Sequence, residues 1–85
     1  MKMNRAQVAD NIKVIMGIRG MTKDALGKAL GASRAYAHQL LKEPYSRLSE
    51  GAVDRIATAL RVPPEWLRDP ELSKRTVDEL KGGTQ

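Results

Sequence analysis

Residues 21–41 read MTKDALGKALGASRAYAHQLL, and their pattern predicts two short helices joined by a tight turn. Thr22 is of the residue type that caps the N-terminus of a helix, and Ser33 is placed to cap a second helix over residues 34–41. Between them, Gly31 can adopt the left-handed conformation that ends one helix and turns the chain. This stretch therefore predicts a helix, a turn and a second helix within 21 residues.

The apolar residues of both segments predict that the two helices pack together. Leu26 and Leu30 are spaced i, i+4 and lie on one face of the first helix, while Ala37, Leu40 and Leu41 form the inner side of the second. Helices this short are not stable alone, so each must be held by packing. Small residues in both segments let the backbones approach closely. The pattern is that of a helix-turn-helix.

The same stretch resembles the helix-turn-helix of Cro and lambda-repressor-like DNA-binding proteins. The matching positions are Thr22, Leu26, Gly27, Leu30, Gly31, Ala32, Ser33, Arg34, Ala37 and Leu40, continued by Leu48-Ser49, Ile56-Ala57, Ala59-Leu60 and Val62. The resemblance covers residues 8–67. Three positions depart from it: Lys23 stands where Gln is usual, Gly27 stands where Ala is commoner, and Leu41-Lys42-Glu43 replaces the usual Glu-x-Gly exit.

The remaining sequence predicts an all-α protein, a compact five-helix lambda-repressor-like domain with a possible sixth helix. Asn4, completed by Gln7 as a capping box, begins a helix that runs to about Gly17. Gly17 and Gly20 are expected to end it, which leaves Arg19 on the connecting loop. Ser49 begins the fourth helix, and Pro64 takes the first turn of a short fifth one. We expect a DNA-binding domain at residues 1–67. The tail at residues 68–85 would form a further helix for dimerisation or partner binding.

Apolar residues at helical spacing define the expected core. It consists of Val8, Ile12, Ile15, Leu26, Leu30, Ala37, Leu40, Val53, Ile56, Leu60, Val62, Trp66 and Leu67. Trp66 is expected to close the bottom of this core, since Trp is largely buried on average.

Composition excludes several classes of function. The chain of 85 residues has no Cys and one His, which excludes disulfides, thiolate chemistry and zinc sites of the His/Cys type. No nucleophile–base pair, phosphate loop or metal cluster has a credible spacing, so we expect no enzyme and no cofactor. No apolar run has the length of a membrane span or signal peptide, which predicts a cytoplasmic protein. The family resemblance implies that the cell is a bacterium or a phage-infected host.

The positive charge of the chain is concentrated on the helix-turn-helix half. Residues 1–47 hold nine Lys and Arg against three acids, whereas residues 48–85 hold six against seven, within a net charge of +5. This asymmetry favours a polyanionic partner, and double-stranded DNA is the partner that the motif implies. The alternative is a basic surface that serves only solubility.

The outer face of the second helix provides the candidate base contacts. Arg34 has the fork geometry to bind guanine, Ala35 can touch a thymine methyl, and Gln39 can pair with adenine. The resemblance likewise implies that Arg34, Ala35 and Gln39 read bases. Tyr36 and His38 complete the candidates, with a phosphate contact as the alternative for each and a bystander role as a further one for His38. Arg34 could instead clamp a phosphate, and Gln39 could be merely solvated.

Phosphate contacts are expected at both ends of the motif. The candidates are Thr22, Lys23 and Ser33 at the helix starts, and Lys42, Tyr45, Ser46 and Arg47 after the second helix, with Arg19 and Lys13 as weaker ones. Each could instead be an ordinary solvated side chain.

These features predict a sequence-specific transcriptional regulator, most simply a Cro-like or immunity repressor that binds a pseudo-palindromic operator as a homodimer, formed in solution or only on DNA. Two alternatives stay open. The chain could be an antitoxin-type autorepressor whose tail binds a toxin, or its helix-turn-helix could serve protein–protein contacts.

Overall fold

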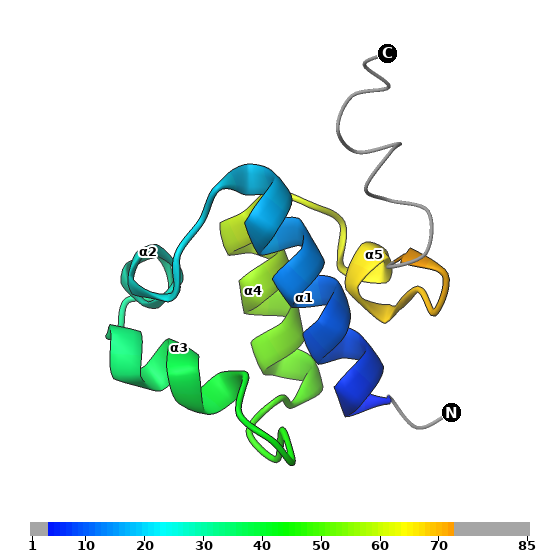
Figure 1. The fold of residues 1–85 in the computed structure, drawn as a ribbon, viewed down its shortest axis with the longest axis horizontal. Coiled ribbons are helices and arrows are strands. Elements are labelled where there is room, and N and C mark those ends of the chain that lie inside the picture. Colours follow the sequence, from blue (N-terminus) through cyan, green and yellow to red (C-terminus); the bar gives the residue numbers. More distant parts are fainter. Residues whose placement is uncertain (1–3, 73–85) are drawn as a thin grey trace.

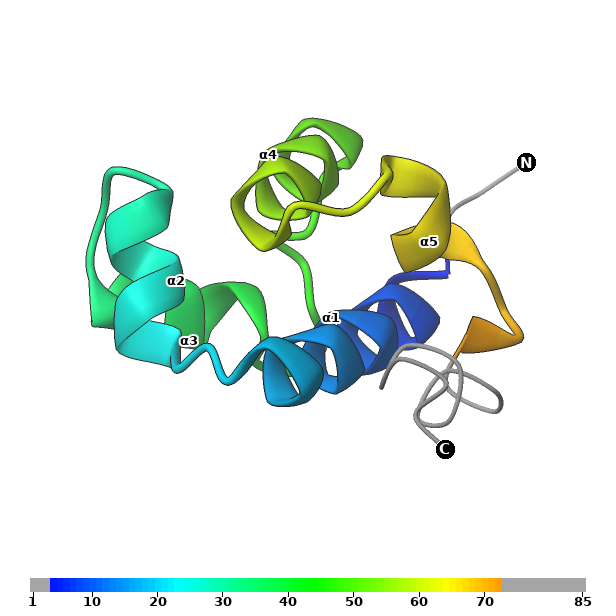
Figure 2. The same ribbon diagram turned by 90° about the horizontal axis from the view of Figure 1, so that it is seen from above.

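The computed structural model of the protein describes residues 4–72, which fold into helices joined by short loops. The helices are α1 (Arg5–Arg19), α2 (Lys23–Ala29), α3 (Arg34–Leu40), α4 (Glu50–Leu60) and α5 (Pro64–Arg68). The α1 and α4 helices pack together in the middle of the molecule, with α2 and α3 at one end and α5 at the other (Figures 1 and 2). The all-α prediction with five helices is confirmed for the described residues.

Four helices begin at the polar residues that the sequence indicated. The side chains of Asn4, Thr22, Ser33 and Ser49 each accept a hydrogen bond from the backbone N–H three residues later. The predicted capping box at Asn4 is wrong in its second half, because the Gln7 amide donates to Asn11 Oδ1 (3.3 Å) instead of returning to the start of the helix.

The end of α1 corrects a second prediction. The helix does not stop near Gly17 but continues to Arg19, and Gly20 ends it at a φ of 68°. Gly17 is tolerated inside the helix, where a single Gly costs only about 1 kcal/mol relative to Ala. Gly31, with a φ of 72°, makes the left-handed turn after α2 as predicted.

One apolar core joins all five helices. Eleven of the thirteen expected core residues are buried, whereas Leu30 and Trp66 are only partly buried and pack against the edge of the core. Trp66 is thus less buried than predicted: it packs against the edge of the core and lines a small pocket with Ile15, Ile18 and Arg19. The buried set also includes Ala9, Met16, Leu41, Tyr45, Leu48, Ala52, Ala57 and Leu72.

A fully buried amide ties α1 to α5. Asn11 is 0% exposed, and its Nδ2 donates to the carbonyls of Leu67 (2.9 Å) and Asp69 (2.8 Å), with Trp66 O at 3.4 Å. These carbonyls lie at the C-terminal end of α5, where helix carbonyls lack partners within the helix. Asn11 thus satisfies the end of a helix more than fifty residues away.

The chain past α5 continues to pack against the domain. Leu72 is 3% exposed and belongs to the core, so the compact part extends beyond residue 67. Most of the helix predicted for residues 68–85 lies outside the described residues. Among residues 4–72, no helix is long and apolar enough to span a membrane.

Candidate nucleic-acid interface

The outer face of α3 brings together four of the five predicted base-contact residues. Arg34, Ala35, His38 and Gln39 are exposed and line one open depression of the surface. Their positions follow from helical periodicity, since residues spaced by three and four share a face, while Ala37 and Leu40 point into the core at 0% and 1% exposure. This face combines a guanidinium, a methyl group, an imidazole and an amide.

Tyr36 lies apart from this face. It is half-buried against the core, and its hydroxyl accepts a hydrogen bond from the Arg55 guanidinium of α4 (3.4 Å). Arg55 was not predicted from the sequence as part of the site. No local pattern reveals its contact, because Arg55 and Tyr36 are 19 residues apart.

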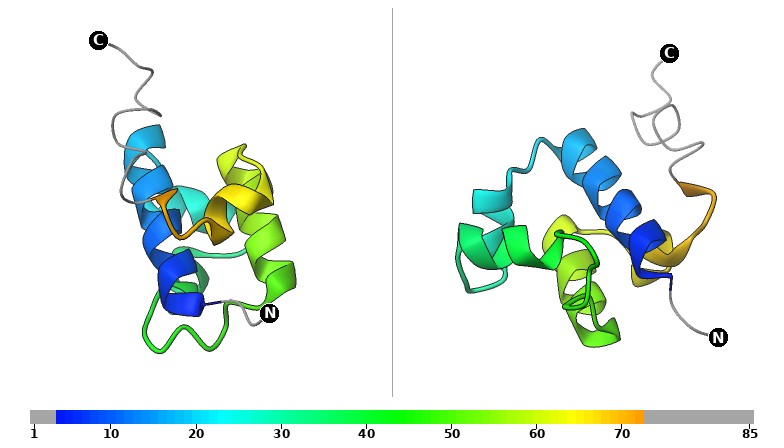
Figure 3. Two further views of the ribbon diagram at one scale, coloured as in Figure 1. Left: turned by 90° about the vertical axis from the view of Figure 1, so that its right-hand side faces the viewer. Right: turned by 60° about the horizontal axis from the view of Figure 1, so that its bottom comes forward.

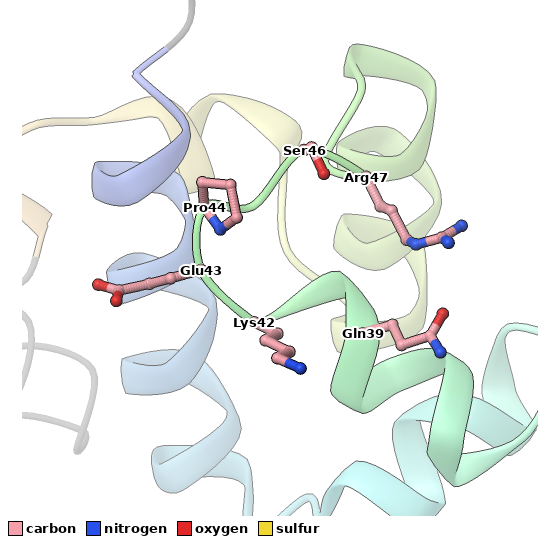
Figure 4. A pocket seen from close by; sticks show the side chains of 6 residues that line it. All are labelled: Gln39, Lys42, Glu43, Pro44, Ser46 and Arg47. Carbon is pink, nitrogen blue, oxygen red and sulfur yellow. The ribbon is translucent and has the colours of Figure 1, made fainter.

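A basic rim continues from α3 into the loop that follows it. Gln39, Lys42, Ser46 and Arg47 line a second open depression together with Glu43 and Pro44. Figure 4 shows the side chains of Gln39 and Arg47 pointing to the same side, while Glu43 points away from them. The exposed guanidinium of Arg47 therefore faces the same way as Gln39, one of the predicted base readers.

The N-terminus of α2 contributes to the other end of the site. Lys23 Nζ lies 3.3 Å from His38 Nδ1, so a cation of α2 contacts the exposed face of α3. Thr22 and Ser33 are also exposed; their oxygens accept from Ala25 N and Tyr36 N, and each hydroxyl keeps its own proton for a further partner.

Three predicted phosphate contacts have structural roles in the fold. Tyr45 is 8% exposed and belongs to the core, with Lys13 Nζ 5.6 Å from the centre of its ring. The Arg19 guanidinium donates to the carbonyls of Leu60 (3.1 Å) and Arg61 (3.3 Å) at the end of α4. Tyr45 thus packs in the core, Arg19 caps the end of α4, and Lys13 lies over the Tyr45 ring, while a phosphate contact by any of them stays a prediction.

Gly27 sets the distance between α2 and the start of α3. A Cβ atom at this position would collide with the backbone carbonyl of Ser33 and lie 2.9 Å from Arg34 N. Ala32 N donates to Gly27 O (2.8 Å) across the same turn. The glycine thus permits the close approach of α3 to α2 (Figure 3).

Comparison with known families agrees with this geometry. A model of the Cro/C1-type HTH DNA-binding domain matches residues 11–70. The chain belongs to this family. No curated protein and no solved structure matches the chain. The matched region contains α2, the turn and α3, which have the helix-turn-helix arrangement that the sequence predicted.

Proposed function

We propose that the protein is a sequence-specific transcriptional regulator that inserts α3 into the major groove of an operator. One observation carries the proposal: the exposed side of α3 presents Arg34, Ala35, His38 and Gln39 on one surface. A helix-turn-helix uses this face of its second helix to reach base edges. Membership of a DNA-binding family supports the class of ligand.

In this proposal each base reader has a partner set by its chemistry. The Arg34 fork matches O6 and N7 of guanine, the Gln39 amide matches N6 and N7 of adenine, and the Ala35 methyl suits the thymine methyl. Tyr36, which the Arg55 guanidinium contacts, lies at the edge of this surface and is the weakest of the five candidates.

Phosphate contacts would orient α3 in the groove. Thr22, Lys23 and Ser33 are available at one end of the motif, and Lys42, Ser46 and Arg47 at the other. Such contacts fix the register of the protein on DNA and supply much of its affinity.

We further propose that the protein is a Cro-like or immunity repressor and acts as a homodimer on a pseudo-palindrome. One recognition helix reads only a few base pairs, so useful specificity needs two half-sites about one helical turn apart. Binding of an operator would then exclude polymerase. Residues 68–85 are the proposed segment for dimerisation or for another protein partner.

Selection from random duplex DNA at near-physiological salt tests the proposal. Wild type should enrich an inverted repeat, and the Arg34→Ala/Gln39→Ala variant should lose or relax that sequence. Both side chains are exposed, so the variant should remain folded. Enrichment of no sequence, with binding that simply fades as salt rises, would show non-specific electrostatic binding and reject the proposed function.

A further inference from the structure

A contact between α2 and α3 favours one tautomer of the His38 imidazole. Lys23 Nζ lies 3.3 Å from His38 Nδ1. A lysine ammonium has three N–H donors and no acceptor, so Nδ1 must be the accepting nitrogen that carries no proton. A neutral imidazole then carries its proton on Nε2. Lys23 therefore favours the Nε2–H tautomer of His38.

The Nε2–H group is available to a ligand on the exposed face of α3. His38 follows Arg34 by four residues, and both side chains line the same depression. Within residues 4–72, the structure gives the Nε2 atom of His38 no hydrogen-bond partner. The pair therefore presents donors only: the guanidinium of Arg34 and the Nε2–H of His38.

A pair of side chains that offers only donors selects acceptors on the DNA. In the major groove, guanine presents O6 and N7 as acceptors, and adenine presents N7. The Arg34 fork matches the two acceptors of guanine, whereas the single Nε2–H donor matches one N7 atom. Because N7 is common to adenine and guanine, such a contact recognises a purine without distinguishing the two.

We propose that His38 reads the N7 atom of a purine next to the guanine bound by Arg34, and that Lys23 is the positioning residue that fixes the required tautomer. This inference rests on the proposed function and adds to it a second donor contact and its base class. Lys23 keeps two further N–H donors, so it can contact a phosphate at the same time.

The free protein tests the role of Lys23. His38 is the sole His of the chain, so its imidazole nitrogens give unambiguous long-range ¹H–¹⁵N NMR signals. With the imidazole neutral, wild type should show Nε2–H, and Lys23→Met should shift the average toward Nδ1–H. Lys28→Met, which removes a charge from the same helix, should leave the imidazole signals unchanged. Identical signals in wild type and Lys23→Met would overturn the positioning role.

Modified duplexes test the base contact. Each purine of the selected operator is replaced in turn by its 7-deaza analogue, which lacks N7. One purine next to the Arg34-dependent guanine should show an affinity loss of about three- to tenfold in wild type. That loss should disappear in His38→Ala, shrink in Lys23→Met and persist in Lys28→Met and Arg34→Ala.

The outcomes separate this inference from the proposed function. One outcome would overturn the purine contact of His38 and leave the proposed function standing. This outcome is a selected operator that depends on Arg34 and Gln39, together with a 7-deaza loss that is unchanged in His38→Ala. Selection of no operator by wild type would overturn both. An operator whose 7-deaza loss vanishes only in His38→Ala would support His38 as a reader but reject Lys23 as its positioning residue.

Discussion

At the scale of single residues, Asn11 shows how a buried polar side chain can hold two helices together. Its amide is fully buried and donates to carbonyls at the end of α5, while its oxygen accepts from Gln7. A buried amide is tolerated only when its hydrogen bonds are made, and this one makes them on both atoms. The residue stabilises the fold and, being fully buried, exposes no surface to a ligand.

Asn11→Asp should therefore destabilise the protein severely. The change replaces two N–H donors with an oxygen that faces the carbonyls of Leu67 and Asp69, and it buries an unpaired charge. We expect a loss of at least about 3 kcal/mol in the free energy of unfolding, measured by urea denaturation. Asn4→Asp is the matched control, since Asp caps a helix as well as Asn does and Asn4 is exposed. Equal stability of the two variants would contradict this role for Asn11.

Gly27 is a residue whose importance depends on its surroundings. Replacing a helical Gly with Ala ordinarily stabilises a helix by about 1 kcal/mol. At Gly27 the added Cβ would meet the Ser33 carbonyl, and backbone atoms cannot move aside as a flexible side chain can. We expect Gly27→Ala to lose about 1–3 kcal/mol and to weaken DNA binding by displacing α3.

Gly17→Ala provides the control for that prediction. A Cβ at Gly17 meets nothing within 4 Å, and the residue lies inside α1. This variant should gain stability while Gly27→Ala loses it, as measured by thermal melting of both. A gain in both variants would show that α2 and α3 are not as close as the structure places them.

At the scale of the elements, the C-terminal ends of α4 and α5 are satisfied by side chains of α1. Arg19 donates to the last carbonyls of α4, and Asn11 donates to those of α5. Carbonyls at the end of a helix have no partner within it, so these contacts join distant parts of the chain. Side chains of α1 therefore hold α4 and α5 in place.

Arg19→Met separates this capping role from a contact with DNA. The variant keeps an apolar stem but removes the donors to Leu60 and Arg61, so stability should fall by about 1 kcal/mol. The salt dependence of DNA binding should not change if Arg19 makes no phosphate contact. A shallower dependence of log K on log salt, with unaltered stability, would restore Arg19 as a phosphate ligand.

At the scale of the whole molecule, the helix-turn-helix and α5 occupy opposite ends (Figure 1). Lys42 and Arg47 lie beside the exposed face of α3, whereas Arg68 of α5 pairs with Asp54 (3.1 Å). A cation that contacts a phosphate releases counterions on binding, and one that is distant from DNA releases none. The salt dependence of binding can therefore locate the DNA on the surface.

Lys42→Ala and Arg47→Ala should each reduce the slope of log K against log salt by about 0.9 for every phosphate that the variant side chain no longer neutralises. Arg68→Ala removes the same charge from the far end and should leave the slope unchanged. Fluorescence anisotropy titrations over a range of salt concentrations measure all three. Equal slopes for the three variants would place the DNA elsewhere.

The sequence by itself determined the features that depend on neighbouring residues. Caps at Thr22, Ser33 and Ser49 bond to N–H groups three residues away, and the turn at Gly31 needs only the conformation of one residue. The exposed face of α3 follows from helical periodicity, so the surface formed by Arg34, Ala35, His38 and Gln39 could be predicted from residue spacing alone. The order of the helices and the family resemblance could also be predicted from these caps, turns and apolar spacings.

Only the tertiary structure decided which polar side chains support the fold and which face outward. Asn11, Arg19, Tyr36 and Tyr45 have partners distant in the sequence, or are buried by elements that no local pattern identifies. The contact between Lys23 and His38 likewise needs the packing of α2 against α3. The physical reason is range: capping and periodicity act within one turn of helix, whereas burial and side-chain pairing depend on where the whole chain brings its helices together.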